Sequence, residues 1–161
     1  MRLALYQPDI PQNTGTILRM AACLGIGVDI IEPCGFFLDD RRLRRSGMTY
    51  LELVNLIRHA SWTDFYRLQN KQKNRLILLT TKGDASFYDF SFQPSDILLM
   101  GCESAGVPQA VHLAANTRLR IPMVEKVRSL NVAMAAAMAV CEALRQINLS
   151  KNKPEVIVNC G

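Results

Sequence analysis

Short apolar runs alternate with helical patterns along most of this chain. The predicted strands are Leu3–Tyr6, Val28–Ile31, Leu76–Thr81, Ile97–Met100 and Arg118–Ile121, with a weaker one at Ile57–Ala60. The predicted helices between them are Thr14–Leu24, Trp62–Lys71, Gln109–Ala115 and Ser129–Ile147. Regular alternation of strand and helix is typical of an α/β fold. We therefore predict a doubly wound, mostly parallel sheet with helices on both faces.

The length of the chain indicates a single domain. Its 161 residues are 49% hydrophobic, which is enough to build one core. We place the domain at residues 1–149 and expect residues 150–161 to form a loosely docked tail. Met1 and Arg2 lead directly into the first strand, so no signal peptide is expected. The most apolar stretch, Val132–Val140, is far shorter than the roughly 20 residues that a membrane span needs.

The cysteines and histidines argue against a metal centre. The five cysteines are far apart in the chain and form no Cys-x-x-Cys pair, and the two histidines have no nearby partner. This pattern matches neither a zinc site nor a disulfide framework. We expect no metal, and we expect a reducing, cytoplasmic location.

The positive charge favours a polyanionic partner. The net charge is +5 and the isoelectric point is near 9.1. Four arginines lie close together directly after Asp39 and Asp40, namely Arg41, Arg42, Arg44 and Arg45. They predict either a phosphate clamp or a solvated helix start with the two aspartates at its positive end. The sequence leaves both interpretations open.

The last predicted helix is apolar on all sides over Val132–Val140. A helix with this pattern is buried either in the core or between its own sheet and a second subunit. A domain of this size offers little room to bury a helix of about five turns on every face. We therefore favour a homodimer interface, and a simple alanine-rich core helix remains the alternative.

Two glycine pairs resemble nucleotide-binding motifs only in part. Gly101 and Gly106 match the first half of a P-loop, but Val107 and Pro108 stand where phosphate binding needs Lys and Ser or Thr. This excludes a kinase or GTPase loop. The other pair, in the segment 25–27, follows a helix and is better explained as a helix C-cap.

Three predicted strands end in segments that present main chain rather than charged side chains. These segments are Leu79–Thr81 with Gly83, Gly101, and Ile121–Met123. Ligands of open α/β sheets bind at the carboxyl ends of the strands. Backbone groups with apolar walls suit a purine and a thioether, which points to S-adenosylmethionine. Ser129 is predicted to cap the last helix, to contact the cofactor, or to do both.

Arg19 is the most chemically informative side chain of the first helix. It lies in an otherwise apolar stretch, and Asn13 is a plausible N-cap for that helix. An arginine that borders a buried face usually has a specific anionic partner. From the residues alone, a salt bridge to Glu103 is the simpler expectation, and a catalytic role is the alternative.

These segments together resemble the SpoU-type branch of the SPOUT RNA methyltransferases. The three family motifs correspond to Asn13-Thr14-Gly15…Arg19, to Gly101-Cys102-Glu103…Gly106-Val107-Pro108, and to Ile121-Pro122-Met123…Ser129-Leu130-Asn131. Within the branch, the chain is most similar to the small wobble-position tRNA 2′-O-methyltransferases of the TrmL (YibK) type. Further matches include Ile31-Glu32-Pro33 and Thr80-Thr81-Lys82-Gly83.

The resemblance implies a deep trefoil knot in the C-terminal part, a homodimer, and S-adenosylmethionine as cofactor. The reaction would be methylation of the ribose 2′-hydroxyl at position 34, cytidine or uridine, of tRNA. The implied catalytic residues are Arg19, Asn13 and Glu103. The implied cofactor-binding residues are Leu79, Gly101, Ile121, Met123, Ser129 and Leu130. The residues implied to grip the anticodon stem-loop are Arg41, Arg42, Arg44, Arg45, Arg58, His59 and Lys82.

Two other functions remain open at this point. One is a 2′-O-methyltransferase that acts on ribosomal RNA, although such relatives often carry an additional amino-terminal domain. The other is a non-catalytic RNA-binding dimer with the same fold. The second alternative is motivated by Ala133-Met134, which stands where relatives commonly carry Ser-Asn.

Overall fold

The computed structural model describes residues 1–37 and 53–150, with side chains up to Asn148. Within these residues, seven strands form one sheet in the order β3-β2-β1-β6-β4-β7-β5, and every neighbouring pair is parallel. The strands are β1 (Arg2–Tyr6), β2 (Gly27–Ile31), β3 (Leu56–His59), β4 (Leu76–Leu79), β5 (Ala85–Ser86), β6 (Ile97–Met100) and β7 (Thr117–Arg120). The predicted parallel α/β architecture is therefore confirmed.

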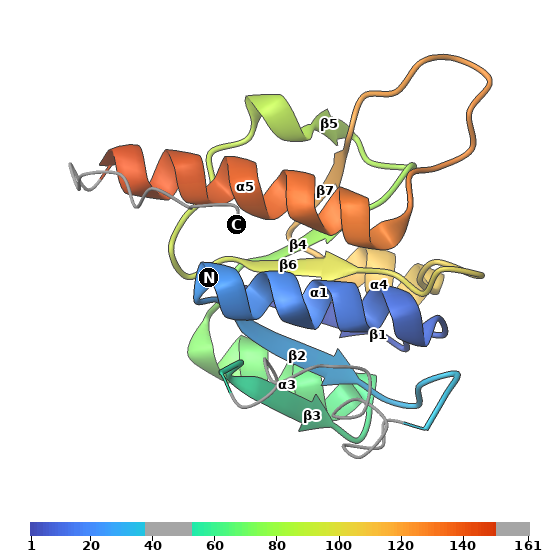
Figure 1. The fold of residues 1–161 in the computed structure, drawn as a ribbon. Coiled ribbons are helices and arrows are strands. Elements are labelled where there is room, and N and C mark those ends of the chain that lie inside the picture. The colour runs from blue at the N-terminus through green and yellow to red at the C-terminus, as the bar shows by residue number, and fades with distance from the viewer. Residues whose placement is uncertain (38–52, 151–161) are drawn as a thin grey trace.

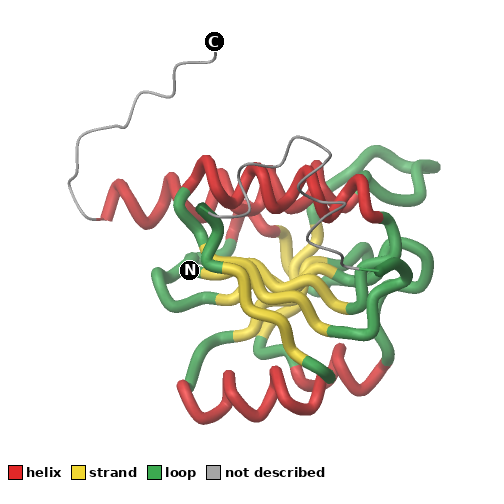
Figure 2. The backbone as a smooth tube through the Cα atoms, turned by 60° about the horizontal axis from the view of Figure 1, so that its bottom comes forward, coloured by secondary structure: helices red, strands yellow, loops and turns green. Residues whose placement is uncertain are grey.

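Helices cover both faces of this sheet. The helices are α1 (Pro11–Leu24), α3 (Trp62–Gln72), α4 (Gln109–Ala114) and α5 (Val132–Ser150), and a short 3₁₀ turn, η2, spans Phe87–Asp89. Figure 2 shows the sheet between two helical layers. Helices α1 and α5 pack side by side on one face, in front of the sheet in Figure 1, and α3 and α4 lie behind it.

Alternation along β1 shows how the strands separate two cores. Leu3 and Leu5 belong to the core under α1 and α5, whereas Ala4 and Tyr6 belong to the core with Phe65 of α3. Successive side chains of a strand point to opposite faces, so a strand that is buried on both faces is apolar throughout. This is why the predicted strands appear as continuous apolar runs.

The differences from the predicted elements have local causes. The predicted strands Leu76–Thr81 and Arg118–Ile121 end earlier, at Leu79 and Arg120, so the residues beyond them form loops. Strand β5 was not predicted, because two residues are too few to show a periodic pattern. No helix in the described part of the chain is long and apolar enough to cross a membrane.

One of the three predicted helix caps is confirmed. Gly25 caps α1 in the left-handed conformation (φ 64°) and donates its N–H to carbonyls of the last turn. Asn13 is not an N-cap, because α1 already begins at Pro11. Ser129 is not one either. The Oδ1 of Asn131 accepts from the N–H groups of Ala133 and Met134, at 2.9 and 3.3 Å, and so caps α5.

Helix α5 packs on one face of the sheet and is not enclosed on all sides by the core. Its alanines at 133, 136, 139 and 143 are buried against the sheet, whereas Met134 is 59% exposed and Cys141 is also exposed. The apolar composition predicted burial on every side, and the fold buries only one of them. Helix α1, which packs beside α5 on the same face of the sheet, also has an exposed side, on which Thr16, Arg19 and Cys23 lie.

Candidate functional site

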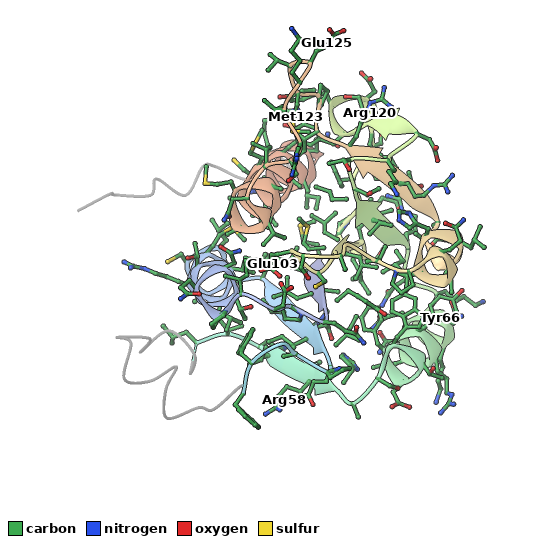
Figure 3. The ribbon with its side chains drawn as sticks, turned by 90° about the vertical axis from the view of Figure 1, so that its right-hand side faces the viewer. Arg58, Tyr66, Glu103, Arg120, Met123 and Glu125 are labelled. Atoms are coloured by element: carbon green, nitrogen blue, oxygen red, sulfur yellow. The ribbon has the colours of Figure 1, made fainter. Side chains whose placement is uncertain are left out.

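A cavity of about 560 Å³ opens at the carboxyl edge of the sheet. Figure 3 looks onto this edge, toward which the strands in Figure 1 point. The walls come from the residues that follow β4, β6 and β7, from the first turn of α1, and from the loop and first turn of α5. The long loop between β7 and α5, orange in Figure 1, projects beyond the sheet and closes one side of the cavity.

The structure brings all six predicted cofactor-binding residues to this one cavity. They are Leu79 at the end of β4, Gly101 after β6, Ile121 and Met123 after β7, and Ser129 and Leu130 before α5. Figure 3 labels Met123 on the projecting loop. The carboxyl ends of parallel strands meet at one edge, so segments far apart in sequence converge there.

The turn after β6 depends on its two glycines. The N–H of Cys102 donates to the carbonyl of Gly106 (3.0 Å), and the N–H of Gly106 donates back to the carbonyl of Cys102 (2.8 Å). Gly106 has φ 69°, which side chains rarely tolerate. A Cβ on Gly101 would lie 3.0 Å from the carbonyl carbon of Gly106. The glycines therefore allow a tight turn whose main chain faces the cavity.

A chain of side-chain hydrogen bonds joins the three motif segments. The Nδ2 of Asn13 in α1 donates to Oε1 of Glu103 (3.1 Å), and the Nδ2 of Asn131 donates to Oδ1 of Asn13 (2.9 Å). Asn131 also caps α5, so the same chain fixes the start of that helix. Asn13 and Glu103 both line the cavity. The first and second motifs are thus joined through Asn13 and Glu103.

Besides the neutral Asn13, Glu103 has an anionic neighbour, Asp9, which was not predicted. The main-chain N–H of Asp9 donates to Oε2 of Glu103 (3.1 Å), and the two carboxyl groups lie close together. Burial, followed by the neighbouring carboxyl of Asp9, raises the pKa of Glu103. Glu103 and Ser104 lower the pKa of Asp9. One carboxyl group therefore holds a proton more tightly than usual, and the other holds one less tightly.

Arg19 lies apart from these residues. It is exposed on α1 and is not among the residues that line the cavity. Six residues separate it from Asn13, which places it roughly 9 Å further along the helix and about 120° round it. The carboxyl group of Glu103 bonds to Asn13 and Asp9. Within the described residues, the structure therefore does not support the predicted salt bridge between Arg19 and Glu103.

The predicted RNA-binding residues fall into three groups. Four of them, Arg41, Arg42, Arg44 and Arg45, lie outside the described residues. Lys82 is exposed at the cavity, and Arg58 is half-exposed at the edge of the sheet (Figure 3). The Nε of Arg58 donates to Oε1 of Glu32 (2.7 Å), which holds its guanidinium in place on the surface.

The prediction that His59 contacts RNA does not fit the structure. His59 is only 7% exposed, and its Nε2 lies 2.7 Å from Oδ1 of Asp29, a carboxylate that is itself 1% exposed. Arg2 binds the other oxygen of that carboxylate at 2.5 Å. Adjacent strand residues point to opposite faces, so His59 turns into the protein while Arg58 turns outward. His59 is a structural residue.

The sequence analysis also missed several polar residues of the site. Arg128 and His112 line the cavity, and Asp9 and Asn131 belong to its hydrogen-bond chain. Arg128 directly precedes a motif serine, which was an available signal. No signal marked Asp9, because its contact with Glu103 spans 94 positions of the chain.

The lining of the cavity suits a flat heterocycle with a short apolar chain. Leu79, Ile121, Leu130 and Val132 supply apolar walls, and Gly101 leaves its main chain open to close approach. The volume lies in the range of small-molecule sites, about 300–1,000 Å³. The glycine turn has no Lys or Ser at the positions that hold a polyphosphate. The residues present therefore fit an adenosine-like ligand better than a nucleoside triphosphate.

Comparison with known proteins gives consistent matches. A tRNA (cytidine(34)-2′-O)-methyltransferase of Beijerinckia indica is 59% identical over 145 residues, which cover 90% of this chain and 91% of that protein. A solved structure described as giving structural insights into the 2-OH methylation of C/U34 on tRNA is 42% identical. It superposes with a TM-score of 0.85 and covers 94% of this chain and 97% of that one.

A third match contains a cofactor. The SpoU methyltransferase AviRb from Streptomyces viridochromogenes, solved in complex with AdoMet, is 28% identical and has a TM-score of 0.83. The similarity covers 93% of this chain and 61% of AviRb. The model of the SpoU rRNA methylase family matches residues 1–141, and the chain therefore belongs to the SpoU methylase family.

Proposed function

We propose that this protein transfers a methyl group from S-adenosylmethionine to the ribose 2′-hydroxyl of the wobble nucleotide, cytidine or uridine 34, of tRNA. The observation that carries the proposal is that the three motif segments build one cavity in a chain of this family. Relatives that span the same length bear the name tRNA (cytidine(34)-2′-O)-methyltransferase. Because tRNA is the substrate, we place the protein in the cytoplasm.

S-adenosylmethionine fits the cavity by shape and by chemistry. When bound, it supplies an electrophilic methyl group on a sulfonium. The residues that would hold it are Leu79, Gly101, Ile121, Met123, Ser129 and Leu130. Apolar walls would enclose the adenine, and main-chain groups beside Gly101 would pair with its polar edge. We expect no metal, because methyl transfer from a sulfonium requires no Lewis acid.

The catalytic task left to the protein is to position the ribose oxygen and to help its proton leave. Arginine is a poor general base, because its pKa lies far above neutrality. Arg19 would instead hold the adjacent phosphate and stabilise negative charge that develops on the oxygen, and the proton would go to phosphate or water. Asn13 and Glu103 would keep the motif segments in register around the reacting groups.

The position of Arg19 leads us to propose that the active unit is a homodimer. Arg19 lies on the exposed side of α1, next to the exposed side of α5 with Met134 and Cys141. A second copy packed on this surface would bring its Arg19 toward the cavity of the first copy. Met134, which belongs to the Ala133-Met134 pair that stands where relatives commonly carry Ser-Asn, lies on this same surface.

We further propose that the C-terminal part forms the deep trefoil knot of the SPOUT fold. Support comes from the sheet order, in which β4 lies between β6 and β7, and from the long loop that leads from β7 back to α5. On this proposal, residues 1–149 are one methyltransferase domain and residues 150–161 are a tail.

For the RNA surface, we propose that the anticodon stem-loop lies along the carboxyl edge. Arg58 and Lys82 mark this edge in the described residues, and Arg41, Arg42, Arg44 and Arg45 would add phosphate contacts. Each phosphate contact contributes to binding without reading the base.

The neighbours Arg58 and His59 give a matched test of this surface. Arg58→Ala should weaken tRNA binding severalfold and leave thermal stability nearly unchanged, because the side chain is half-exposed. His59→Ala should lower the free energy of unfolding by about 2 kcal/mol, because it removes a buried ring and a buried hydrogen bond. The folded fraction of His59→Ala should bind tRNA normally.

Denaturant titration measures the free energy of unfolding of both variants, and a gel-shift assay measures their tRNA binding. A stable His59→Ala protein that had lost tRNA binding would contradict this assignment.

The decisive experiment for the function is methyl transfer from labelled S-adenosylmethionine to total tRNA from a host that lacks this gene. Nucleoside mapping should place a 2′-O-methyl group at position 34. Incorporation into ribosomal RNA but not into tRNA would replace the proposal with the ribosomal alternative. Failure to bind the cofactor, combined with RNA binding, would indicate a non-catalytic RNA-binding dimer.

A further inference from the structure

A buried carboxylate oxygen beside the cavity lacks a donor. The Oδ1 of Asp9 is buried and has no hydrogen-bond partner among the described residues. The other oxygen, Oδ2, accepts from the N–H of Ser104 (3.3 Å). Gly35 packs so closely over Asp9 that an added Cβ would lie 2.7 Å from the Cβ of Asp9. A buried acceptor without a donor is costly, so the position requires an explanation.

Glu103 is the neighbour that can supply the missing hydrogen. One carboxylate oxygen of Asp9, one of Glu103 and the Sγ of Cys102 lie within 4.8 Å of one another, and the main-chain N–H of Asp9 donates to Oε2 of Glu103 (3.1 Å). Two ionised carboxylates at this distance repel each other, whereas one proton between them converts the repulsion into a strong hydrogen bond. A single proton on this pair would therefore remove the repulsion between the carboxylates and supply the hydrogen bond that Oδ1 of Asp9 lacks.

The pKa shifts of the pair favour Glu103 as the carrier of such a proton. Burial and the neighbouring carboxyl of Asp9 raise the pKa of Glu103, while Glu103 and Ser104 lower the pKa of Asp9. The pKa of Glu103 rises and the pKa of Asp9 falls, which is the pattern expected of two neighbouring carboxyl groups that share one proton.

The other titratable groups near this pair are few within the described residues. They are Cys102 on the same turn, Tyr6 at the end of β1, Arg128 on the cavity loop, and Glu32, Cys34 and Arg58 around the segment that packs on Asp9. Asn13 and Asn131, which face the pair from α1 and from the cap of α5, carry no charge. None of the groups that bond directly to Glu103 is a cation. The main-chain N–H groups of Asp9 and Glu103 and the amide of Asn13 favour the ionised form, but burial and the Asp9 carboxyl outweigh them and leave the pKa raised.

We propose that Glu103 acts as a protonated acid that donates to Oδ1 of Asp9, and that this bond latches the turn 102–106 to the loop 7–10. Asp9 is then a positioning residue. It touches neither the cofactor cavity nor the substrate, but it holds in place a residue that lines the cavity.

The latch connects two walls of the cavity. One wall contains Glu103, Ala105 and Gly106, and the other contains Ile10 and Asn13. Ionisation of Glu103 would set two carboxylates against each other and push these walls apart. The bond from Asn13 to Glu103 and the bond from Asn131 to Asn13 would carry the displacement to the start of α5.

The sign of the pH dependence follows from the raised pKa of Glu103. A group whose pKa is raised on folding stabilises the folded state fully below its unfolded pKa, and this contribution is lost as the pH rises through the folded pKa. Asp9, whose pKa is lowered, loses its contribution only as the pH falls toward strongly acidic values. Cofactor affinity should therefore decline on the alkaline side of the folded pKa of Glu103.

Isosteric variants separate the roles of proton and charge. Glu103→Gln places a permanent N–H donor opposite Asp9, so it should abolish the alkaline decline and keep the cofactor Kd within about threefold of the value for the protonated wild type. Glu103→Ala lacks the donor and should weaken binding at least tenfold at every pH. Asp9→Asn offers an amide donor to an ionised Glu103, so the pKa of Glu103 should fall toward its ordinary range, and only the part caused by burial should remain. Asp9→Ala, which removes the partner altogether, controls for this effect.

Two measurements test the latch. Calorimetric titration with S-adenosylhomocysteine across pH 4 to 9 gives the affinity profile, and ¹³C NMR of labelled glutamate carboxyls gives the protonation state of Glu103 directly. A Glu103 signal that titrates in the ordinary range in the wild type would overturn the proposal. So would a Glu103→Gln protein as impaired as Glu103→Ala.

The inference rests on the proposed function only through the ligand used as a probe. The NMR titration and the pH dependence of thermal unfolding need no ligand. If S-adenosylhomocysteine fails to bind at any pH while the Glu103 signal still titrates above its usual range, the proposed function fails and the latch stands.

Discussion

Arg19→Ala is expected to reduce methyl transfer by a factor of about 10³ and to leave cofactor affinity within about threefold of wild type. The size of the effect is that of removing one group that stabilises charge in a transition state, about 10²–10³. The selectivity follows from the position of Arg19, which lies outside the cavity on the exposed side of α1. Single-turnover methylation and calorimetry measure the two quantities separately.

Two controls make this result specific. Arg19→Lys keeps the charge but not the planar fork that binds phosphate, so it should recover only part of the activity. Mixed dimers test the proposed assembly. Arg19→Ala protein combined with a variant blocked at the cofactor cavity should regain activity if each site uses the arginine of the other copy. Undiminished turnover of Arg19→Ala would remove Arg19 from the catalytic residues, and mixed dimers without activity would place it in its own site.

Gly83→Ala is expected to cost about 3 kcal/mol of stability, as overpacking of a rigid site does. A Cβ on this buried glycine would lie 2.5 Å from the N of Arg120 and 2.7 Å from the O of Leu119, both of them main-chain atoms of β7. Neither atom can move without displacing the strand. Gly83 closes the turn that begins at Thr80, so the cavity wall formed by Thr81 and Lys82 must shift as well.

The consequence for function should accompany the loss of stability. We expect the cofactor Kd to rise at least tenfold in the folded Gly83→Ala protein, measured below its unfolding temperature. Gly25→Ala is the matched control. Gly25 has a positive φ of 64° but nothing within 4 Å of an added Cβ, so the substitution should cost about 1 kcal/mol from backbone strain alone. Its cofactor affinity should stay at the wild-type value. Equal effects of the two substitutions on affinity would contradict the close-approach argument.

Much of the site could be predicted because the fold is a parallel sheet. Once the apolar runs are identified as parallel strands, their carboxyl ends must share an edge, so Leu79, Gly101 and Ile121 must lie together. The chemistry of glycines and apolar side chains at that edge already distinguished an adenosine-like ligand from a polyphosphate. Neither inference needs knowledge of how individual side chains pack.

Errors arose where a side chain had two local options and a distant residue decided between them. Serine and asparagine are both common helix caps, so residue type alone does not distinguish Ser129 from Asn131. In the structure Asn131 caps α5, and its side chain also donates to Asn13, 118 positions earlier in the chain. His59 on an edge strand could have faced solvent, but Asp29 and Arg2 form a buried polar site for it. The apolar surroundings of Arg19 suggested a bond to Glu103, but the carboxyl group of Glu103 bonds to Asn13 and to the main chain of Asp9 instead.

The amino-acid sequence by itself determined the α/β class, the edge at which the ligand site lies, and the strand ends at Leu79, Gly101 and Ile121 that line it. These follow from the spacing of apolar residues and from the positions of glycines, which are local properties. Only the tertiary structure decided which groups the charged side chains meet: Glu103 lies against Asp9, and His59 bonds to Asp29. It also decided that Arg19 lies away from the cavity. The physical reason is that a buried charge must be neutralised or paired, and its partner comes from whichever segment the fold brings within reach.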